Sequence, residues 1–327
     1  MVIQERTQLI AEPMSQADTQ QLAQTIDEAL KAVDTTMYDA VDSKVTVLRD
    51  ASRHILGAGG KRVRPRMMLL SYAALGGTNF DAVLPVAAAV ELVHTASVVH
   101  DDINDHGVMR RGRPSVNAIW GRTFALLTGD YLFTQVYELM APYGSEMNTI
   151  LAAGTTALVE GETLQAAAVK DNNLSREIYF EIIGLKTAAL FRSAAMLGSR
   201  LAGATDPVAE AFGQYGYNVG LAFQIIDDIL DLIGDAEQLG KTSGIDVEQG
   251  RGIAVAYTAG NTPDNAGSSD PMVAIKQKLL QGDAIDTGRA QARQLVEMAI
   301  DALDVLPESA AKDELIALAY QVVDRDR

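Results

Sequence analysis

Two acidic clusters with the same spacing constrain this chain more than any other feature. Each follows an apolar segment, the first of which runs over residues 83–99. The clusters are Asp101, Asp102 and Asp105, and Asp227, Asp228 and Asp231. Carboxylates at positions i, i+1 and i+4 repel one another in a helix, so a cation must offset their charge. Oxygen ligands at this density suit Mg²⁺ with attached phosphates.

One acidic cluster of this kind most often lies on a solvated helix face and has no function. Two copies, far apart in the sequence and each at the end of an apolar segment, favour a functional interpretation. We therefore expect two acidic walls that face each other and hold a metal–diphosphate between them.

The composition limits the class of protein. The chain has 327 residues, of which 48% are hydrophobic, and a net charge of −16, which argues against a nucleic-acid partner. The absence of cysteine excludes disulfides and zinc–sulfur sites, and we expect a cytoplasmic protein. No charge-free apolar run is long enough for a transmembrane segment. We expect residues 1–18 to form a flexible leader without the pattern of a secretion signal, ahead of one domain over residues 19–327.

Apolar residues recur at helical spacing along most of the chain. No segment of useful length shows the alternation of apolar and polar residues that is typical of a β-strand. Ser175 is a candidate N-cap, and Gly184 marks an expected break between two helices. The fold class is therefore predicted to be all-α. The expected helices cover residues 20–41, 45–56, 67–75, 81–104, 121–140, 146–168, 175–183, 188–201, 206–233, 272–281, 286–305 and 308–323.

A glycine-rich basic loop, GAGGKRVRP, spans residues 57–65. Its glycines let the backbone approach an anion closely, and Lys61, Arg62 and Arg64 supply charge-assisted donors. Pro65 suits the first turn of the helix that follows. The loop on its own is equally compatible with an ordinary exposed turn.

Further polar segments lie between apolar ones. GETLQ, at residues 161–165, is a polar patch inside a predicted helix. Lys186 and Thr187 stand beside the expected break at Gly184, where a satisfied kink is the alternative to a functional role. Residues 235–253 are rich in charge and glycine, which is typical of a lid or an active-site loop.

These motifs resemble those of the trans-isoprenyl diphosphate synthases, and most of all the medium- and long-chain polyprenyl diphosphate synthases. The resemblance covers nearly the whole chain from residue 20 onward. Its segments occur in the family's order: GGKRVRP, HTASVVHDDIND, RRGRPSVNAIWG, GDYLF, GETLQ, LKTAALF, FQIIDDILD and LGKTSGID. The resemblance implies the isoprenoid synthase fold, a single large helical bundle around a deep central cavity, with the two acidic motifs facing each other at its mouth.

The resemblance also implies roles for individual residues. Three Mg²⁺ ions would join the diphosphate of an allylic substrate to Asp101, Asp105 and Asp227. The other carboxylates, which would ligate or support the ligands, are Asp102, Asp228 and Asp231. The same diphosphate would be held by Arg110, Lys186 and Lys241. Isopentenyl diphosphate would be bound by Lys61, Arg64, His94 and Arg111.

In such enzymes the allylic C–O bond ionises and the isopentenyl double bond attacks the cation, which Thr187 and Gln224 would stabilise with oxygen dipoles. The departing diphosphate would accept the proton. For His94 a buried core histidine is the alternative. The family's lysine after the second motif is replaced by Arg251, which leaves its role in binding the allylic diphosphate open. The basic end of the chain, residues 323–327, would close over the isopentenyl site.

Two other functions compete with the synthase. An isoprenoid cyclase would also bind an allylic diphosphate, but such enzymes usually lack the GGKRVRP segment and the second aspartate motif. A non-catalytic regulatory subunit of a heteromeric synthase would be expected to lose acidic residues from one motif, whereas both motifs are complete here. The resemblance alone implies a homodimer.

Three positions before the first acidic motif bear on product length: Val93, Ala96 and Ser97. Short-chain relatives usually carry bulky aromatic residues at the second and third of these positions, whereas here both are small. This predicts a cavity floor deeper in the fold, near Tyr137 or Met140, and a product longer than geranylgeranyl diphosphate. Close helix packing is the alternative reason for the small residues, and geranylgeranyl diphosphate is the alternative product.

Overall fold

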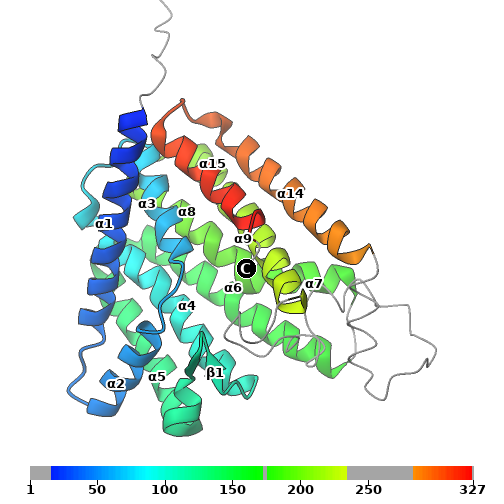
Figure 1. Cartoon of the computed structure of the whole chain (residues 1–327). Helices are drawn as coiled ribbons and strands as arrows, with labels where there is room; N and C mark the ends of the chain where they lie inside the picture. The colour runs from blue at the N-terminus through cyan, green and yellow to red at the C-terminus, as the bar shows by residue number, and fades with distance from the viewer. Residues whose placement is uncertain (1–15, 172–174, 234–282, 326–327) are drawn as a thin grey trace, which may run out of the picture.

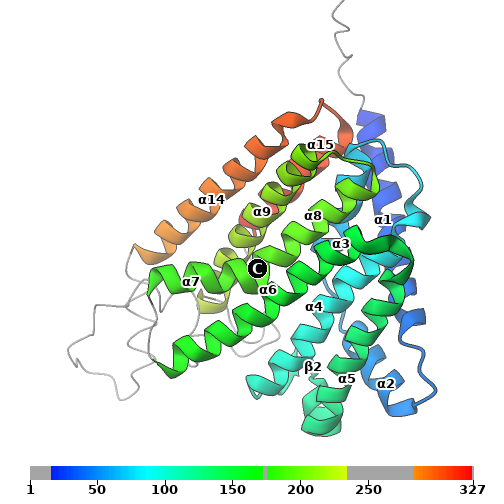
Figure 2. The same cartoon turned by 180° about the vertical axis from the view of Figure 1, so that it is seen from behind.

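The computed structural model describes residues 16–171, 175–233 and 283–325. The described part is built of helices, apart from one short two-stranded ribbon, so the prediction of an all-α fold is confirmed. No helix in these ranges is long and apolar enough to cross a membrane. Helices α1 and α14 form opposite flanks of the molecule, and α3, α4, α8 and α9 lie between them (Figures 1 and 2).

The helices of the first half are α1 (Gln16–Ala40), α2 (Thr46–Leu56), α3 (Val63–Ala74), α4 (Leu84–Asn104), α5 (Val116–Met140) and α6 (Gly144–Lys170). Those of the second half are α7 (Arg176–Ile183), α8 (Ala189–Leu201), α9 (Asp206–Ile233), α14 (Ala284–Ala302) and α15 (Ala310–Val323). Short 3₁₀ turns occupy Phe80–Ala82, Ala141–Tyr143 and Leu303–Val305. The ribbon pairs β1 (Met109–Arg110) with β2 (Arg113–Pro114) in antiparallel register.

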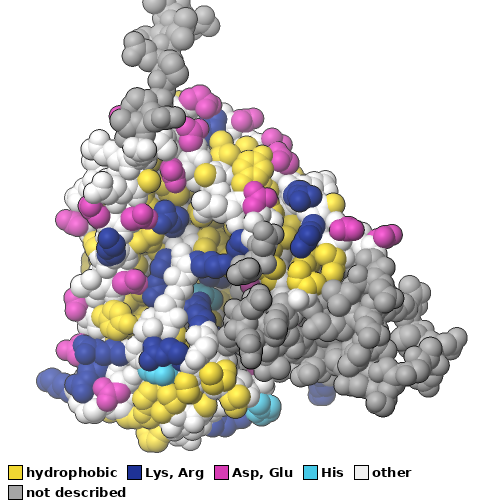
Figure 3. All heavy atoms as spheres, viewed as in Figure 1, with side chains coloured by type: hydrophobic (Ala, Val, Ile, Leu, Met, Phe, Trp, Pro, Cys, Tyr) yellow, Lys and Arg dark blue, Asp and Glu magenta, His cyan; other side chains and the backbone are white. Residues whose placement is uncertain are grey.

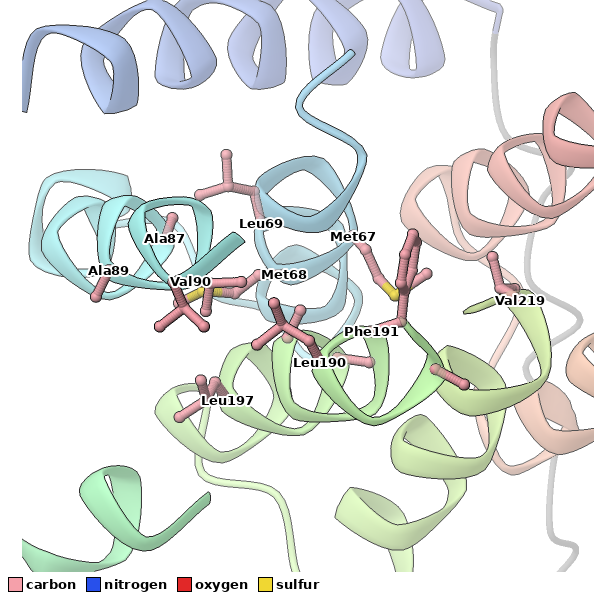
Figure 4. Packing of buried hydrophobic residues seen from close by; sticks show 14 of the residues in the cluster. Met67, Met68, Leu69, Ala87, Ala89, Val90, Leu190, Phe191, Leu197 and Val219 are labelled. Carbon is pink, nitrogen blue, oxygen red and sulfur yellow. The ribbon is translucent and has the colours of Figure 1, made fainter. Parts of the chain in front are cut away.

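The centre of the core lies where α3, α4 and α8 meet. Met68 of α3, Val90 of α4 and Leu190 of α8 are fully buried and point toward one another (Figure 4). Each such side chain stabilises the fold by about 1.5–3 kcal/mol relative to an exposed position. Gly198 allows the closest approach in this region, because a methyl group there would lie 2.1 Å from the backbone oxygen of Met68. The rigid core holds the ends of α4 and α9, which carry the acidic clusters.

Local signals explain several helix boundaries. Ser175 caps α7 by accepting a hydrogen bond from the backbone N–H of Ile178, as predicted. Ser115 and Ser309 cap α5 and α15 in the same way. Pro65 lies in the first turn of α3, as predicted, although α3 begins at residue 63 rather than 67.

Four expectations about the elements need correction. Helix α1 begins at Gln16, so residues 16–18 of the expected leader are helical. Helix α5 begins at residue 116 rather than 121, because Ser115 supplies a cap and Gly121 absorbs a kink with φ 79°. The ribbon was not predicted, since each strand is too short to show alternation. The expected helix over residues 272–281 lies outside the described residues.

The fourth correction concerns Gly184, where we expected a helix break. A π-helical turn, Gly184–Ala188, instead joins α7 to α8 without interruption. A π turn keeps the backbone hydrogen-bonded while it widens the helix, and such turns occur frequently at functional sites. The turn carries Lys186 and Thr187, two of the candidate site residues.

Candidate active site

A cavity of about 670 Å³ opens between the start of α3, the ends of α4 and α9, and the middle of α6. Its wall includes Asp101, Asp102 and Asp105 from the first acidic motif, and Asp227 and Asp231 from the second. The two motifs therefore face one cavity. Both lie at the C-terminal ends of their helices, where the helix dipole adds negative potential. This side of the cavity strongly favours bound cations.

The carboxylates fit a divalent metal that is shared with a phosphate ligand. No group of three or more acidic or histidine side chains in the described ranges converges on one point, so the protein alone builds no closed metal cage. Mg²⁺ is usually bound by one or two carboxylates and keeps its other positions for water and substrate phosphates. The Oδ2 atom of Asp102 is buried and has no hydrogen-bond partner among the described residues, as expected of an oxygen that awaits a ligand.

Asp102 forms a tight ion pair with Arg110. The Nη2 and Nε atoms of Arg110 donate to Oδ1 of Asp102 at 2.6 and 3.0 Å, and the Asp102 side chain is 2% exposed. Burial raises the pKa of Asp102, and the guanidinium of Arg110 opposes that rise. Arg110 lies in the cavity wall as predicted, and the structure adds that its charge is shared with a carboxylate of the first motif.

Lys186 is surrounded by polar partners from two helices. Its Nζ atom lies 2.5 Å from Oε1 of Glu162 and 3.5 Å from Oδ2 of Asp101, and it donates to Oε1 of Gln165 at 3.3 Å. The approach requires Gly161, where a methyl group would lie 2.6 Å from the backbone nitrogen of Lys186. Burial and the neighbouring charge of Asp101 raise the pKa of Glu162 to about 7. The GETLQ segment therefore contributes Glu162, a site residue that sequence reasoning did not assign.

Thr187 and Gln224 lie together in the cavity wall, as predicted. The hydroxyl of Thr187 donates to Oε1 of Gln224 at 2.8 Å, and Nε2 of Gln224 donates to Oδ1 of Asp228 at 2.7 Å. Tyr179 of α7 donates to Oδ2 of Asp228 at 2.6 Å. Asp228 does not line the cavity, unlike the other two carboxylates of its motif.

Basic side chains line the same cavity and form a basic pocket within it. Figure 3 shows lysine and arginine side chains gathered in the middle of the molecular face that it draws. The basic residues that line the pocket are Lys61, Arg62, Arg64, His94, Arg111 and Arg325. Arg64 lies 4.5 Å from the centre of the Phe191 ring, and burial lowers the pKa of Arg64 to about 10, so it remains a cation at neutral pH.

His94 belongs to this pocket, not only to the core. It lies in the cavity wall on the same face as Arg64 and Arg111. Burial and these two neighbouring cations lower the pKa of His94 well below its usual value. The imidazole is therefore neutral at pH 7 and can offer one N–H donor to an anion without adding charge.

Arg62, from the same loop, has a different role. It adopts left-handed backbone geometry with φ 48° and donates to Asp34 at 2.8 Å and to Glu91 at 3.0 Å. Glu91 is buried, so Arg62 neutralises a carboxylate of the protein itself. Arg325, near the end of the chain, stacks on Phe223 at 4.2 Å and lines the cavity, where we expected the basic terminus.

The three residues that were expected to bear on product length, Val93, Ala96 and Ser97, differ in where they lie relative to the cavity. Ser97 lines the cavity, whereas Ala96 and Val93 are fully buried in the core and form no part of its wall. The expectation that both small residues face the cavity therefore holds only for Ser97. Met140 is buried, but Tyr137 is 73% exposed and does not lie at a cavity floor. Lys241 and Arg251 lie outside the described residues.

Comparison with known proteins agrees with this geometry. The family model described as polyprenyl synthetase matches residues 45–281. The chain is 35% identical to the all-trans-nonaprenyl-diphosphate synthase (geranyl-diphosphate specific) of Rhodobacter capsulatus, over 94% of this chain and 98% of that one. It is 32% identical to the octaprenyl diphosphate synthase of Escherichia coli K12, over 91% and 96% of the two chains.

The fold is likewise similar to that of solved structures. The polyprenyl synthase of Caulobacter crescentus, crystallised with calcium and isoprenyl diphosphate, superposes with a TM-score of 0.88 at 31% identity. The match covers 96% of this chain and all of that one. Family match, whole-length relatives and shared architecture agree with a cavity that both acidic motifs and a basic pocket line. The chain therefore belongs to the polyprenyl synthetase family, the trans-isoprenyl diphosphate synthases.

Proposed function

We propose that this chain condenses isopentenyl diphosphate with an allylic diphosphate and repeats the reaction to give a product longer than geranylgeranyl diphosphate. One observation carries the proposal: carboxylates of both acidic motifs and a cluster of basic side chains line a single cavity. Two diphosphates of different function can therefore bind side by side. A metal-bound diphosphate suits the acidic side, and a free diphosphate suits the basic side.

The basic pocket is assigned to isopentenyl diphosphate. Arg64 is a buried cation, Arg111 is an exposed one, and a neutral His94 adds a donor. Lys61 lies at the pocket's exposed edge, and Arg325 covers it from the end of the chain. This chemistry holds a diphosphate without a metal, so this substrate would not ionise.

The acidic side is assigned to the allylic diphosphate. Asp101, Asp105 and Asp227 would hold three Mg²⁺ ions, with Asp102, Asp228 and Asp231 as further ligands or as their supports. The metal would neutralise the diphosphate as it leaves. Lys186, Arg110 and Lys241 are assigned to the same diphosphate. Lys186 in particular can move its ammonium group between Glu162, Asp101 and a phosphate oxygen.

Thr187 and Gln224 are assigned to the cation that forms when the allylic C–O bond breaks. Both line the same cavity as the acidic motifs, where oxygen dipoles can face the developing positive charge. The complete acidic motifs disfavour a non-catalytic subunit. The departing diphosphate, which remains on the acidic side, is the proposed proton acceptor.

The length of the product is inferred from the relatives and from the cavity. The two similar synthases described above make nonaprenyl and octaprenyl diphosphate, according to their names. In this chain the small Ser97 leaves the cavity wall open next to the first motif, where a ring would obstruct the tail. Geranylgeranyl diphosphate is the less favoured product.

A homodimer in the cytoplasm is also proposed. Helices α5 and α6 expose large apolar side chains, among them Phe124, Leu127, Tyr137 and Val159, which a second copy would cover. Sedimentation at micromolar concentration should show a dimer, and a monomer would contradict it. The lack of cysteine agrees with a reducing compartment.

One experiment tests the proposed reaction. The purified chain is incubated with Mg²⁺, isopentenyl diphosphate and farnesyl diphosphate, and the length of the product is measured. A ladder of products beyond the C20 length is expected. A cyclic hydrocarbon, or no turnover by the chain alone, would refute the proposal, and a C20 product alone would refute its chain-length part.

A further inference from the structure

Tyr179 contacts the second acidic motif from outside the cavity. Its hydroxyl donates to Oδ2 of Asp228 at 2.6 Å, and both residues are buried. The other oxygen of Asp228 accepts from Nε2 of Gln224 at 2.7 Å. We propose that Tyr179 and Asp228 are positioning residues that orient the amide of Gln224, so that its oxygen faces the reacting carbon.

The orientation of the amide follows from the donor and acceptor inventory. An ionised carboxylate only accepts hydrogen bonds, so the NH₂ end of Gln224 must face Asp228. The oxygen end then faces Thr187, whose hydroxyl donates to it at 2.8 Å. Gln224 and Thr187 line the cavity, whereas Asp228 does not. The carboxylate thus fixes an oxygen dipole on the cavity side, where a cation would form.

Tyr179 holds this carboxylate in a fixed plane. Without it, Asp228 could rotate about its terminal torsion, which is broad in carboxylate side chains. Hydrogen bonds to an ionised acceptor are short and strong, so one hydroxyl on Oδ2 suffices to restrict that rotation. Tyr179 and Thr187 lie about two turns apart on the segment that passes through the π turn, which brings both against α9.

The hydrogen bonds of Asp228 give it a different role from Asp227 and Asp231 in the same motif. Asp227 and Asp231 line the cavity wall, where the metal-bound ligand is proposed to bind. Asp228 points to Tyr179 and Gln224, so its charge orients the amide. The second motif therefore divides its carboxylates between ligand binding and positioning.

This inference rests on the proposed function, and a double-mutant cycle tests it. Tyr179→Phe, Gln224→Leu and the double variant are compared by steady-state kinetics with saturating Mg²⁺. Tyr179→Phe should lower kcat about 10-fold, the factor that corresponds to one hydrogen bond to a charged group, with little change in KM for either substrate. In the Gln224→Leu background the same change should cost no further activity, because Tyr179 acts through Gln224.

Tyr215→Phe is the matched control. Tyr215 is also buried, and its hydroxyl also donates a hydrogen bond, to the backbone oxygen of Leu315 at 2.7 Å, but it lies outside the cavity. It should lose stability as Tyr179→Phe does while keeping its kcat. Binding of inorganic diphosphate with Mg²⁺, measured by calorimetry, should be unchanged in Tyr179→Phe.

The outcomes separate this inference from the proposed function. Additive losses in the double variant, or weaker binding of Mg²⁺ and diphosphate to Tyr179→Phe, would overturn the positioning role while wild-type turnover remains. A wild-type chain that does not turn over the two diphosphates would overturn the proposed function, and the inference with it.

Discussion

The ammonium group of Lys186 lies 2.5 Å from Glu162, and the two side chains come from the π turn and from α6. Glu162 is half-buried next to a second carboxylate, Asp101, and its pKa is raised to about 7 from an ordinary value of 4.5. The folded chain therefore binds this proton more tightly than the unfolded chain does. The contribution to stability is complete below about pH 4.5 and is lost as the pH rises through about 7.

Glu162→Gln should consequently stabilise the metal-free protein at alkaline pH. The amide resembles the protonated acid, so the melting temperature should exceed that of the wild type by about 2 °C or more at pH 8, and the difference should vanish near pH 5. Thermal denaturation at the two pH values measures it. Glu160→Gln, at an exposed position of the same helix, is the control and should show no such trend. Equal melting temperatures at pH 8 would contradict the raised pKa.

Asp101→Ala and Asp227→Ala should each lower turnover by several orders of magnitude. Each removes a carboxylate that faces the proposed metal–diphosphate. The fold should stay intact, because removal of one charge from an acidic cluster relieves repulsion in the metal-free protein. Circular dichroism and steady-state kinetics check both parts. An active Asp101→Ala variant, or wild-type turnover without a divalent metal, would exclude this mechanism.

Arg64→Ala and Lys61→Ala should raise KM for isopentenyl diphosphate far more than KM for the allylic substrate. Each loses a charge-assisted contact worth roughly 1.5–3 kcal/mol, which corresponds to about a 10-fold or larger change. The larger effect is expected for Arg64, since it is buried whereas Lys61 is exposed. Initial rates with each substrate varied in turn give the two constants. Equal changes in both would mean that the loop is assigned to the wrong substrate.

Arg62→Ala should affect stability instead of substrate affinity. Its loss leaves Glu91 buried without its cation, and such a change typically costs about 3–5 kcal/mol. Urea denaturation of Arg62→Ala and Arg64→Ala, compared with KM values for both, separates the two roles. A stable Arg62→Ala variant with a raised KM for isopentenyl diphosphate would place Arg62 in the substrate pocket.

Ser97→Phe should shorten the product, because the ring would enter the cavity beside the first acidic motif. Ala96→Phe should chiefly destabilise the fold, since Ala96 is fully buried in the core, where overpacking costs about 1–3 kcal/mol. The two variants form a matched pair, and both are compared by chromatography of their products and by their melting temperatures. An unchanged product distribution in Ser97→Phe would show that the tail does not pass this wall.

The features that could be predicted from the sequence are those that depend on the periodicity of apolar residues and on the spacing of motif residues. Apolar repeats indicated the helices, and two apolar segments that end in aspartates indicated two acidic walls of one cavity. Spacing could not separate Arg62 from Arg64, because the left-handed geometry of Arg62 turns it toward Glu91. Nor could it separate Ala96 from Ser97, since neighbours on a helix point about 100° apart and the contact face depends on packing.

The contacts that orient other side chains were the hardest to predict. Glu162 and Tyr179 contact the site from helices that lie far along the sequence from both acidic motifs. A single glutamate or tyrosine in a helix forms no sequence pattern that would mark it as a site residue. The π turn was also missed, because a glycine in a helical segment signals a break as readily as a widened turn. Such features depend on how distant helices pack against each other.

The π turn at Gly184–Ala188 limits how this site can change in evolution. A π turn holds one residue more than an α-helical turn, so loss of any single residue from it would restore regular geometry. Everything before the deletion would then rotate by about 100° relative to everything after it. Tyr179 and Thr187 could no longer face the same helix. Point substitutions can therefore change single side chains of the site, whereas a deletion or an insertion of one residue would separate Tyr179 from Thr187 in a single step.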